Sequence, residues 1–234
     1  MPTVLITGAN RGLGLGLTRA YLEDGWNVLA VNREHSAELE ALEQDELELI
    51  HCELTDDRDL ASLASWLKDR TIDVLINNAG RMAKTGPVTN GESTQGFGHF
   101  DRDLWRDVFD INLFTPMHLC ELLVDNVAQS NNGRMVTLSS MLGSMALNST
   151  GGLYAYRASK AGVNAIMASM AIDLRDRGIT AIAMHPGWVQ TDMGGAGADL
   201  DVETSVNGMK KVIDGLSPEY SGKFLSWDGS EMPW

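Results

Sequence analysis

Cysteines and long apolar runs, which mark secreted and membrane-spanning proteins, are scarce in this chain. The two cysteines among 234 residues, Cys52 and Cys120, lie in apolar contexts and predict no disulfide framework. No apolar run approaches the roughly 18 to 20 residues that cross a bilayer. No basic segment precedes the apolar residues that follow Met1, so a secretory signal is not indicated. We therefore expect a cytoplasmic protein without a membrane partner.

Positive charge is scarce as well. The chain has 18 Lys and Arg against 32 Asp and Glu, which gives a net charge of −14. Nucleic acids and anionic membranes need a basic face, so neither is expected as a partner. An anionic ligand would be repelled at long range and must be held by local cations and backbone dipoles. The five His residues show no metal-ligand spacing, so no metal is expected, and His185, beside Pro186, is interpreted as structural.

What the chain does have is a regular alternation of short apolar runs and helical patterns. The expected strands are Val4–Thr7, Asn27–Val31, Leu47–Cys52, Asp73–Asn77, Arg134–Ser139 and Thr180–Met184, and the expected helices are Leu13–Glu23, Ala37–Glu43, Asp57–Lys68, Arg102–Ala128 and Tyr156–Arg177. Brief strands that are apolar throughout are typical of parallel sheets covered on both faces. Alternation with helices implies right-handed crossovers. No composition break interrupts the pattern. We predict a single domain, residues 1–234, of the α/β class: a doubly wound parallel sheet of the Rossmann type, with about seven strands and helices on both faces.

Three segments between these elements are rich in Gly, Ser, Thr or Asn: residues 81–100, 141–153 and 194–200. Each follows the carboxyl end of an expected strand, where ligands bind in a doubly wound sheet. Long loops at this position usually line a site, although a plain surface excursion is the alternative. We interpret the three segments as substrate loops.

A glycine turn follows the first expected strand and leads directly into a helix. Its residues, from Thr7 to Gly14, read Thr-Gly-Ala-Asn-Arg-Gly-Leu-Gly. Glycines permit a tight turn and a close approach of the backbone to a pyrophosphate, while a helix N-terminus offers free N–H groups and a positive dipole end. The Gly-x-x-x-Gly-x-Gly spacing differs from the general dinucleotide fingerprint, but its place between strand and helix favours a dinucleotide site.

The end of the second expected strand indicates which dinucleotide. NAD enzymes place an acidic residue there, on the ribose 2′-hydroxyl, but this chain has Asn32 followed by Arg33. Arg11, in the glycine turn, can lie close by. Two guanidiniums without a carboxylate suit a 2′-phosphate, so NADP(H) is favoured and NAD(H) is the alternative. Both arginines could instead balance surface acids.

Tyr156 and Lys160 are four residues apart in the last expected helix and therefore lie on one helical face. A free tyrosine titrates at about 10, and a neighbouring ammonium lowers that pKa toward the range useful in acid–base catalysis. Tyr and Lys at this spacing are also common on plain helix surfaces. Tyr154 competes for the role, but its i+4 neighbour is Ala158, so it cannot form such a pair.

In their order and spacing, these motifs resemble the short-chain dehydrogenase/reductase family in its single-domain form. The resemblance covers nearly the whole chain and is carried by Thr7–Gly14, Asn77-Asn78-Ala79-Gly80, Asn112, Ser139-Ser140, Tyr156 with Lys160, Pro186-Gly187 and Thr191. The closing segments Gly222–Gly229 and Met232-Pro233-Trp234, with the Ser139–Ser144 loop, are similar to the subgroup of C-factor-like proteins and sniffer-type carbonyl reductases.

The resemblance implies an NADP(H)-dependent oxidoreductase that transfers a hydride between nicotinamide and a small-molecule carbonyl or alcohol substrate. Tyr156 would be the general acid or base, Lys160 would lower its pKa and bind the nicotinamide ribose, Ser140 would hydrogen-bond the substrate oxygen, and Asn112 would hold a relay water. The implied cofactor-binding residues are Gly8, Asn10, Arg11, Gly12, Leu13, Gly14, Asn32, Arg33, Glu53, Leu54, Asn78, Ala79, Gly80, Tyr156, Lys160, Pro186, Gly187, Val189 and Thr191.

Some positions leave a choice or depart from the family pattern. Ser139 and Ser140 are strand neighbours that point to opposite sides, and alignment with the family favours Ser140. Glu53 stands where the family usually has Asp beside the adenine. Arg81 could meet an acidic substrate group or form a surface ion pair. Trp188, with nearby Met residues, is a candidate pocket wall or ordinary packing.

Two further expectations concern function and assembly. The alternative to an enzyme is a nucleotide-sensing or signalling protein of the same fold with little turnover, but the complete Asn112, Ser140, Tyr156 and Lys160 set argues against it. An enoyl reductase expects a longer Tyr-to-Lys spacing, and Val163 stands seven residues after Tyr156. Similar proteins pair through the helices expected at 102–128 and 156–177, so a homodimer or homotetramer is expected.

Overall fold

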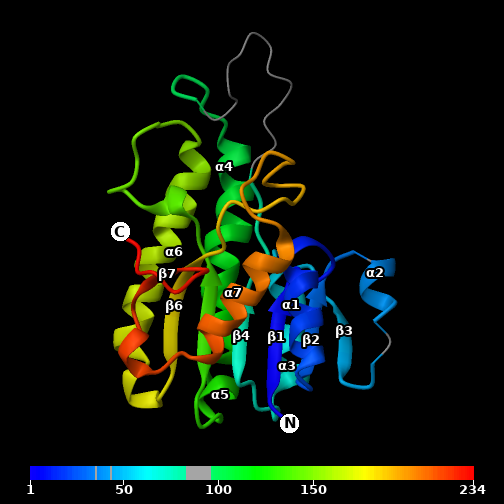
Figure 1. Ribbon diagram of the computed structural model, residues 1–234. Coiled ribbons are helices and arrows are strands. Elements are labelled where there is room, and N and C mark those ends of the chain that lie inside the picture. The colour runs from blue at the N-terminus through cyan, green and yellow to red at the C-terminus, as the bar shows by residue number, and fades with distance from the viewer. Residues whose placement is uncertain (35, 43, 83–95) are drawn as a thin grey trace.

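A computed structural model describes residues 1–34, 36–42, 44–82 and 96–234, and it contains one sheet of seven parallel strands (Figure 1). The strands are β1 (Thr3–Thr7), β2 (Asn27–Asn32), β3 (Leu47–His51), β4 (Val74–Asn77), β5 (Arg134–Leu138), β6 (Thr180–His185) and β7 (Phe224–Ser226). Their order across the sheet is β3-β2-β1-β4-β5-β6-β7. The order reverses direction between β1 and β4, so the predicted doubly wound, Rossmann-type sheet is confirmed.

Helices cover both faces of the sheet (Figure 1). They are α1 (Gly12–Glu23), α2 (Ala37–Glu40), α3 (Asp57–Leu67), α4 (Arg102–Phe109), α5 (Thr115–Ala128), α6 (Tyr154–Asp173) and α7 (Val202–Asp214). Alternate strand residues face opposite sides. Leu5 and Leu75 therefore join the core under α3, α5 and α6, while Val4 and Ile76 join the core under α1 and α7.

Several element boundaries differ from the sequence expectation. The helix expected over 102–128 is interrupted by a π-helical turn, Asp110–Phe114, between α4 and α5. The helix expected from Tyr156 begins at Tyr154 and gives way to a short 3₁₀ turn at Arg175–Arg177. α2 ends at Glu40, and residue 43 of the helix expected there lies outside the described residues.

One helix was missed. α7 begins after Asp201, whose carboxylate accepts a hydrogen bond from the Thr204 N–H, and it buries Val206, Met209 and Ile213. The cap and the apolar spacing are both readable in the sequence. Within the described ranges, no helix is long and apolar enough to cross a bilayer.

Candidate active site

The glycine turn at the carboxyl end of β1 is packed too tightly to hold side chains. Gly8 has a positive φ of 66°. A Cβ on Gly14 would lie 2.1 Å from the Gly8 carbonyl oxygen and 2.6 Å from the Asn78 amide nitrogen. The glycines therefore bring the backbone of the turn against the end of β4 and leave its outer side open to a ligand.

The N-terminus of α1 has free capacity for an anion. Its N-cap residue, Arg11, forms no side-chain cap among the described residues, and no acidic residue lies in the first turn. By contrast, α3 and α7 are capped by the carboxylates of Asp56 and Asp201. Uncapped N–H groups and the helix dipole together suit a phosphate. The open turn and the uncapped helix thus fit the pyrophosphate of a dinucleotide.

The Asn78–Gly80 segment braces this turn. The Asn78 amide donates to the carbonyls of Thr7 at 2.8 Å and Gly8 at 3.1 Å, and the Thr7 hydroxyl accepts from the Asn78 and Ala79 N–H groups. Asn78 therefore joins the ends of β1 and β4 through its side chain. A Cβ on Gly80 would lie 3.0 Å from Asn112 Oδ1 and 3.6 Å from Lys160 Nζ, so this glycine lies between two of the predicted catalytic residues.

At the end of β2, the two arginines expected to receive a 2′-phosphate are already paired with carboxylates. Arg33 contacts Glu34 at 2.8 Å and Glu53 at 3.4 Å. Arg11 contacts Asp192, in the loop after β6, at 2.5 Å. These pairs are exposed, and exposed ion pairs contribute about 0 to 1 kcal/mol. A doubly charged phosphate can therefore displace the carboxylates at little cost.

Two further groups at this end bear on cofactor binding. Asn32 Oδ1 is buried and has no hydrogen-bond partner within the described part of the chain, which leaves an acceptor at the expected adenosine end. Burial tends to raise the pKa of Glu53, but hydrogen bonds from Thr55 and the nearby Arg33 outweigh it and lower that pKa. Glu53 is therefore ionised and held by Arg33 and Thr55. Leu54, also expected here, is buried and accepts the Thr115 hydroxyl through its carbonyl.

Tyr156, Ser140 and Lys160 come together at the carboxyl ends of β4 and β5. The Ser140 hydroxyl hydrogen-bonds the Tyr156 side chain, and Lys160 Nζ lies 5.8 Å from the centre of the Tyr156 ring. Nζ donates to the Leu138 carbonyl at 2.7 Å. All three residues are at most 9% exposed, so the cluster is largely excluded from water.

The acid–base properties of this cluster differ from the sequence expectation. Burial raises the pKa of Tyr156, and the hydrogen bond with Ser140 only partly opposes the rise. The expected lowering by Lys160 is therefore not what the structure gives, because burial dominates. Burial also lowers the pKa of Lys160 to about 8. Tyr156 is thus a protonated phenol at neutral pH, which is the form that donates a proton.

The two neighbouring serines point in opposite directions. The Ser139 hydroxyl donates to Asn164 Oδ1 at 2.6 Å, behind the cluster, while the Ser140 hydroxyl faces Tyr156.

Asn112 lies in the π-helical turn and is 1% exposed. Its amide accepts from the Arg81 N–H and donates to the Arg81 carbonyl and the Ser159 hydroxyl. The Asn112 side chain therefore fixes the chain that leaves β4, and Arg81 itself forms a surface ion pair with Asp107.

The loop after β6 borders the site from the other side. Gly187 has a φ of 87°, the Pro186 carbonyl accepts the Ser205 hydroxyl, and Val189 bridges to Leu200. The Thr191 methyl would lie 3.4 Å from a Cβ on Gly12, so this loop closes against the glycine turn. Of the three expected substrate loops, residues 83–95 of the first lie outside the described residues.

Two positions that matter for the site were not singled out from the sequence. Arg157 donates to the carbonyls of Gly152 and Leu142 and to the Thr150 hydroxyl, which fixes the loop at 141–153. Asp192 holds Arg11, as described above. The Arg11–Asp192 contact joins positions 181 residues apart, and the Arg157 contacts depend on how the preceding loop folds back on α6, so no local sequence pattern signals either.

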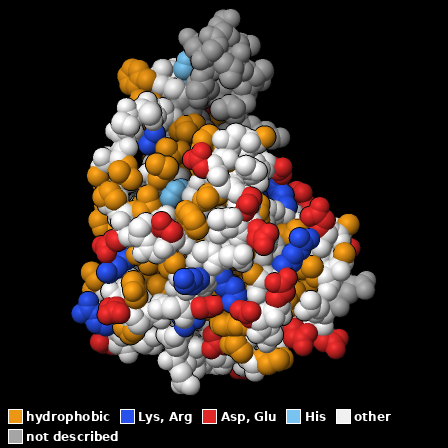
Figure 2. Space-filling view, in the orientation of Figure 1, with side chains coloured by type: hydrophobic (Ala, Val, Ile, Leu, Met, Phe, Trp, Pro, Cys, Tyr) orange, Lys and Arg blue, Asp and Glu red, His pale blue; other side chains and the backbone are white. Residues whose placement is uncertain are grey.

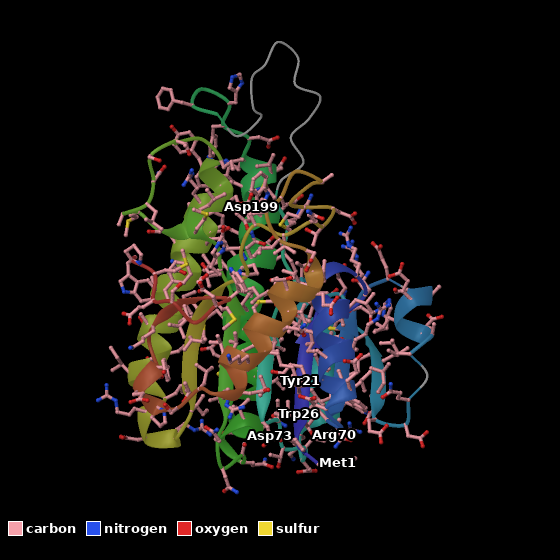
Figure 3. The ribbon with its side chains drawn as sticks, viewed as in Figure 1. Met1, Tyr21, Trp26, Arg70, Asp73 and Asp199 are labelled. Atoms are coloured by element: carbon pink, nitrogen blue, oxygen red, sulfur yellow. The ribbon has the colours of Figure 1, made fainter. Side chains whose placement is uncertain are left out.

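Large apolar side chains are exposed around this end of the sheet. They include Phe97, Met141, Met145, Leu147, Tyr154, Trp188 and Met193. Figure 2 shows hydrophobic side chains gathered on the upper part of the visible face. In Figure 3, Asp199 lies at this end, while Tyr21, Trp26, Arg70 and Asp73 lie at the opposite end of the sheet. The apolar rim therefore adjoins the polar cluster of Tyr156, Ser140 and Lys160, a combination typical of small-molecule sites.

Comparisons with known proteins agree with this geometry. Residues 2–199 match the short chain dehydrogenase family. The C-signal protein of Myxococcus xanthus is 42% identical over 163 residues, which cover 70% of this chain and 93% of that protein. The carbonyl reductase Sniffer of D. melanogaster superposes with a TM-score of 0.87 at 31% identity, covering 100% of both chains. The NADPH-bound carbonyl reductase from chicken fatty liver gives a TM-score of 0.84 at 32% identity, covering 100% of this chain and 99% of that one.

Proposed function

This chain belongs to the short chain dehydrogenase family, and from that premise we propose that it is an NADP(H)-dependent carbonyl reductase acting on small molecules. The observation that carries the proposal is the buried contact between Ser140 and Tyr156, with Lys160 beside them at the carboxyl end of the sheet. A protein that only bound a nucleotide would have no use for a buried, protonated phenol there.

The residues of the cluster divide the work of reducing a carbonyl. Tyr156 donates its proton to the oxygen of the substrate as negative charge develops on it. Ser140, which hydrogen-bonds Tyr156, also positions and stabilises that oxygen. Lys160 supplies positive charge close to both groups. In alcohol oxidation Tyr156 would first have to lose its proton, and its raised pKa keeps the proton-donating form needed for reduction dominant near neutral pH.

The residues present fit a bound NADP(H), which would supply the hydride. The glycine turn and the uncapped N-terminus of α1 would hold the pyrophosphate. Arg11 and Arg33 would hold the 2′-phosphate, and the loop from Pro186 to Thr191, which closes against the glycine turn, would border the nicotinamide end. The structural relatives bound to NADP or NADPH support this choice.

The Arg33→Ala variant tests the preference for a 2′-phosphate. We expect NADPH affinity to fall roughly tenfold, because a bidentate guanidinium–phosphate contact is lost, and NADH affinity to stay the same. Fluorescence titration gives both dissociation constants. Arg70→Ala is the matched control, since Arg70 pairs with Glu48 and lies at the opposite end of the sheet (Figure 3). Equal losses for both nucleotides would contradict the assignment.

The pH dependence of reduction follows from Lys160. Its folded pKa, about 8, is below its unfolded value, so the ammonium is lost as the pH rises through 8. The value of kcat/KM for NADPH reports the pKa values of the free enzyme. We therefore expect it to be constant below about pH 7 and to fall as the pH rises through about 8. In the Lys160→Arg variant the side chain stays charged at this pH. The pH profile of this variant should therefore lack the fall near pH 8, even if the variant is slower overall. An unchanged fall in Lys160→Arg would assign the titration to another group.

Signalling is the second candidate function, favoured by the name of the Myxococcus relative, C-signal. NADPH oxidation with a panel of aldehydes, ketones and diketones separates the two candidates. The reductase proposal expects turnover with at least one carbonyl. Tight NADPH binding without turnover on any member of the panel would favour the signalling candidate.

A further inference from the structure

The ladder of backbone hydrogen bonds between β5 and β6 ends where the strands reach the active site, and the next backbone N–H bonds a side chain instead. The Ser139 N–H donates to the Met184 carbonyl at 2.7 Å. In a parallel ladder the next N–H on this edge, two residues later, belongs to Met141 and would reach the carbonyl two residues beyond Met184. That carbonyl belongs to Pro186 and accepts the Ser205 hydroxyl at 2.6 Å. The Met141 N–H therefore takes a different acceptor.

The acceptor is the imidazole of His185, the last residue of β6. The Met141 N–H donates to His185 Nδ1 at 3.2 Å. The His185 ring is 8% exposed, and burial lowers its pKa to about 4, although Asp228 opposes the shift. The ring is thus neutral at pH 7. Because Nδ1 accepts, the ring proton is on Nε2.

This contact completes the support of Ser140. The backbone N–H before Ser140 and the one after it are both anchored to β6, one by a carbonyl and the other by the imidazole. Ser140 in turn accepts the Gly143 N–H through its carbonyl at 2.8 Å and the Leu142 N–H through its hydroxyl at 3.1 Å. The backbone is therefore anchored both before and after Ser140, and this fixes the position of the hydroxyl that faces Tyr156.

We propose that His185 is a positioning residue for carbonyl reduction, which fixes the backbone on either side of Ser140 so that its hydroxyl meets both Tyr156 and the substrate oxygen. The proposal rests on the reductase function proposed above. Its physical basis is that a misplacement of about 1 Å at the reacting groups costs up to roughly a hundredfold in rate.

Three substitutions at this position separate the hydrogen bond from simple packing. His185→Leu keeps a buried side chain but removes the acceptor. His185→Asn places its oxygen at the same bond distance from the backbone as Nδ1, and His185→Gln places its oxygen one bond farther out. We expect kcat to fall roughly tenfold in His185→Leu and His185→Gln and to recover in His185→Asn, with the NADPH dissociation constant unchanged in all three. If His185→Leu does not fold, the Asn and Gln variants still decide.

A double variant then tests whether His185 acts through Ser140. In a Ser140→Ala background, His185→Leu should cause no further loss of kcat, because the group that it positions is gone. Equal losses in the Asn and Gln variants, or full additivity with Ser140→Ala, would overturn the positioning role.

The reductase proposal and the positioning proposal can fail independently of each other. A fully active Tyr156→Phe enzyme would contradict the reductase mechanism, whereas an inactive Tyr156→Phe with a fully active His185→Leu would contradict only this inference.

Discussion

Replacing Tyr156 with Phe is expected to lower kcat for carbonyl reduction by roughly 10²- to 10⁴-fold, the usual contribution of a general acid. The buried phenol is the proton donor of the cluster. The Ser140 hydroxyl is a much weaker acid, and Lys160 Nζ lies 5.8 Å from the centre of the Tyr156 ring and is anchored to the Leu138 carbonyl, so neither group is expected to replace the phenol. The substitution removes one oxygen and keeps the ring in place. The NADPH dissociation constant, measured by fluorescence titration, should therefore stay close to the wild-type value.

The chain offers a matched control two residues earlier. Tyr154 is 42% exposed and belongs to the apolar rim, where its ring, which Tyr154→Phe keeps, packs near Phe97 outside the cluster of Ser140 and Lys160. Tyr154→Phe removes the same oxygen from the same helix, so it should leave kcat within about the variation of a neutral surface substitution. If both variants lost activity to a similar degree, the loss in Tyr156→Phe would reflect the helix and not the acid.

Gly14→Ala carries the second large expected effect, a fall of about 10- to 100-fold in NADPH affinity. A Cβ at this position would lie 2.1 Å from the Gly8 carbonyl oxygen, which is backbone and cannot rotate away. The turn must open, at a cost of about 1 to 3 kcal/mol for overpacking, and 1.4 kcal/mol corresponds to a tenfold change in affinity. NADPH titration with the folded variant measures the effect directly.

Gly16→Ala is the control for this substitution. Gly16 lies one half-turn farther along α1, and its Cβ would meet the Val206 side chain of α7 at 2.8 Å. The substitution therefore strains the packing of α1 on α7 without touching the glycine turn. We expect a lower melting temperature but an unchanged NADPH dissociation constant. If Gly16→Ala weakened NADPH as much as Gly14→Ala, general loosening of α1 would explain both results.

The sequence predicted the sheet well because most of the strands are short apolar runs and most are followed by a helical pattern. Six strands and five helical regions could be placed in this way. The π-helical turn at Asp110–Phe114 could not, because its one extra residue leaves the apolar pattern of the surrounding helix nearly unchanged. α7 was missed even though its Asp201 cap is visible in the sequence.

The sequence predicted those residues of the candidate site that belong to recognisable motifs, but it did not predict the contacts between them. The sequence supplied Tyr156, Lys160 and Ser140, but it predicted the wrong direction for the Tyr156 pKa, because burial depends on the packing of the whole site. The pairing of Arg11 with Asp192 joins residues 181 positions apart. The sequence interprets His185 as structural, and its contact with Met141, seen in the structure, connects it to Ser140. Contacts of this kind are set by the three-dimensional fold and have no local signature.

The most direct test of the reductase proposal uses NADPH in which both hydrogens at the nicotinamide C4 position are replaced by deuterium, together with a carbonyl substrate from the panel. Mass spectrometry of the alcohol product then shows whether the label has been transferred. We predict one deuterium on the carbinol carbon with the wild-type protein and negligible labelled alcohol with Tyr156→Phe. An unlabelled alcohol, or no alcohol from any carbonyl despite tight NADPH binding, would contradict the proposal.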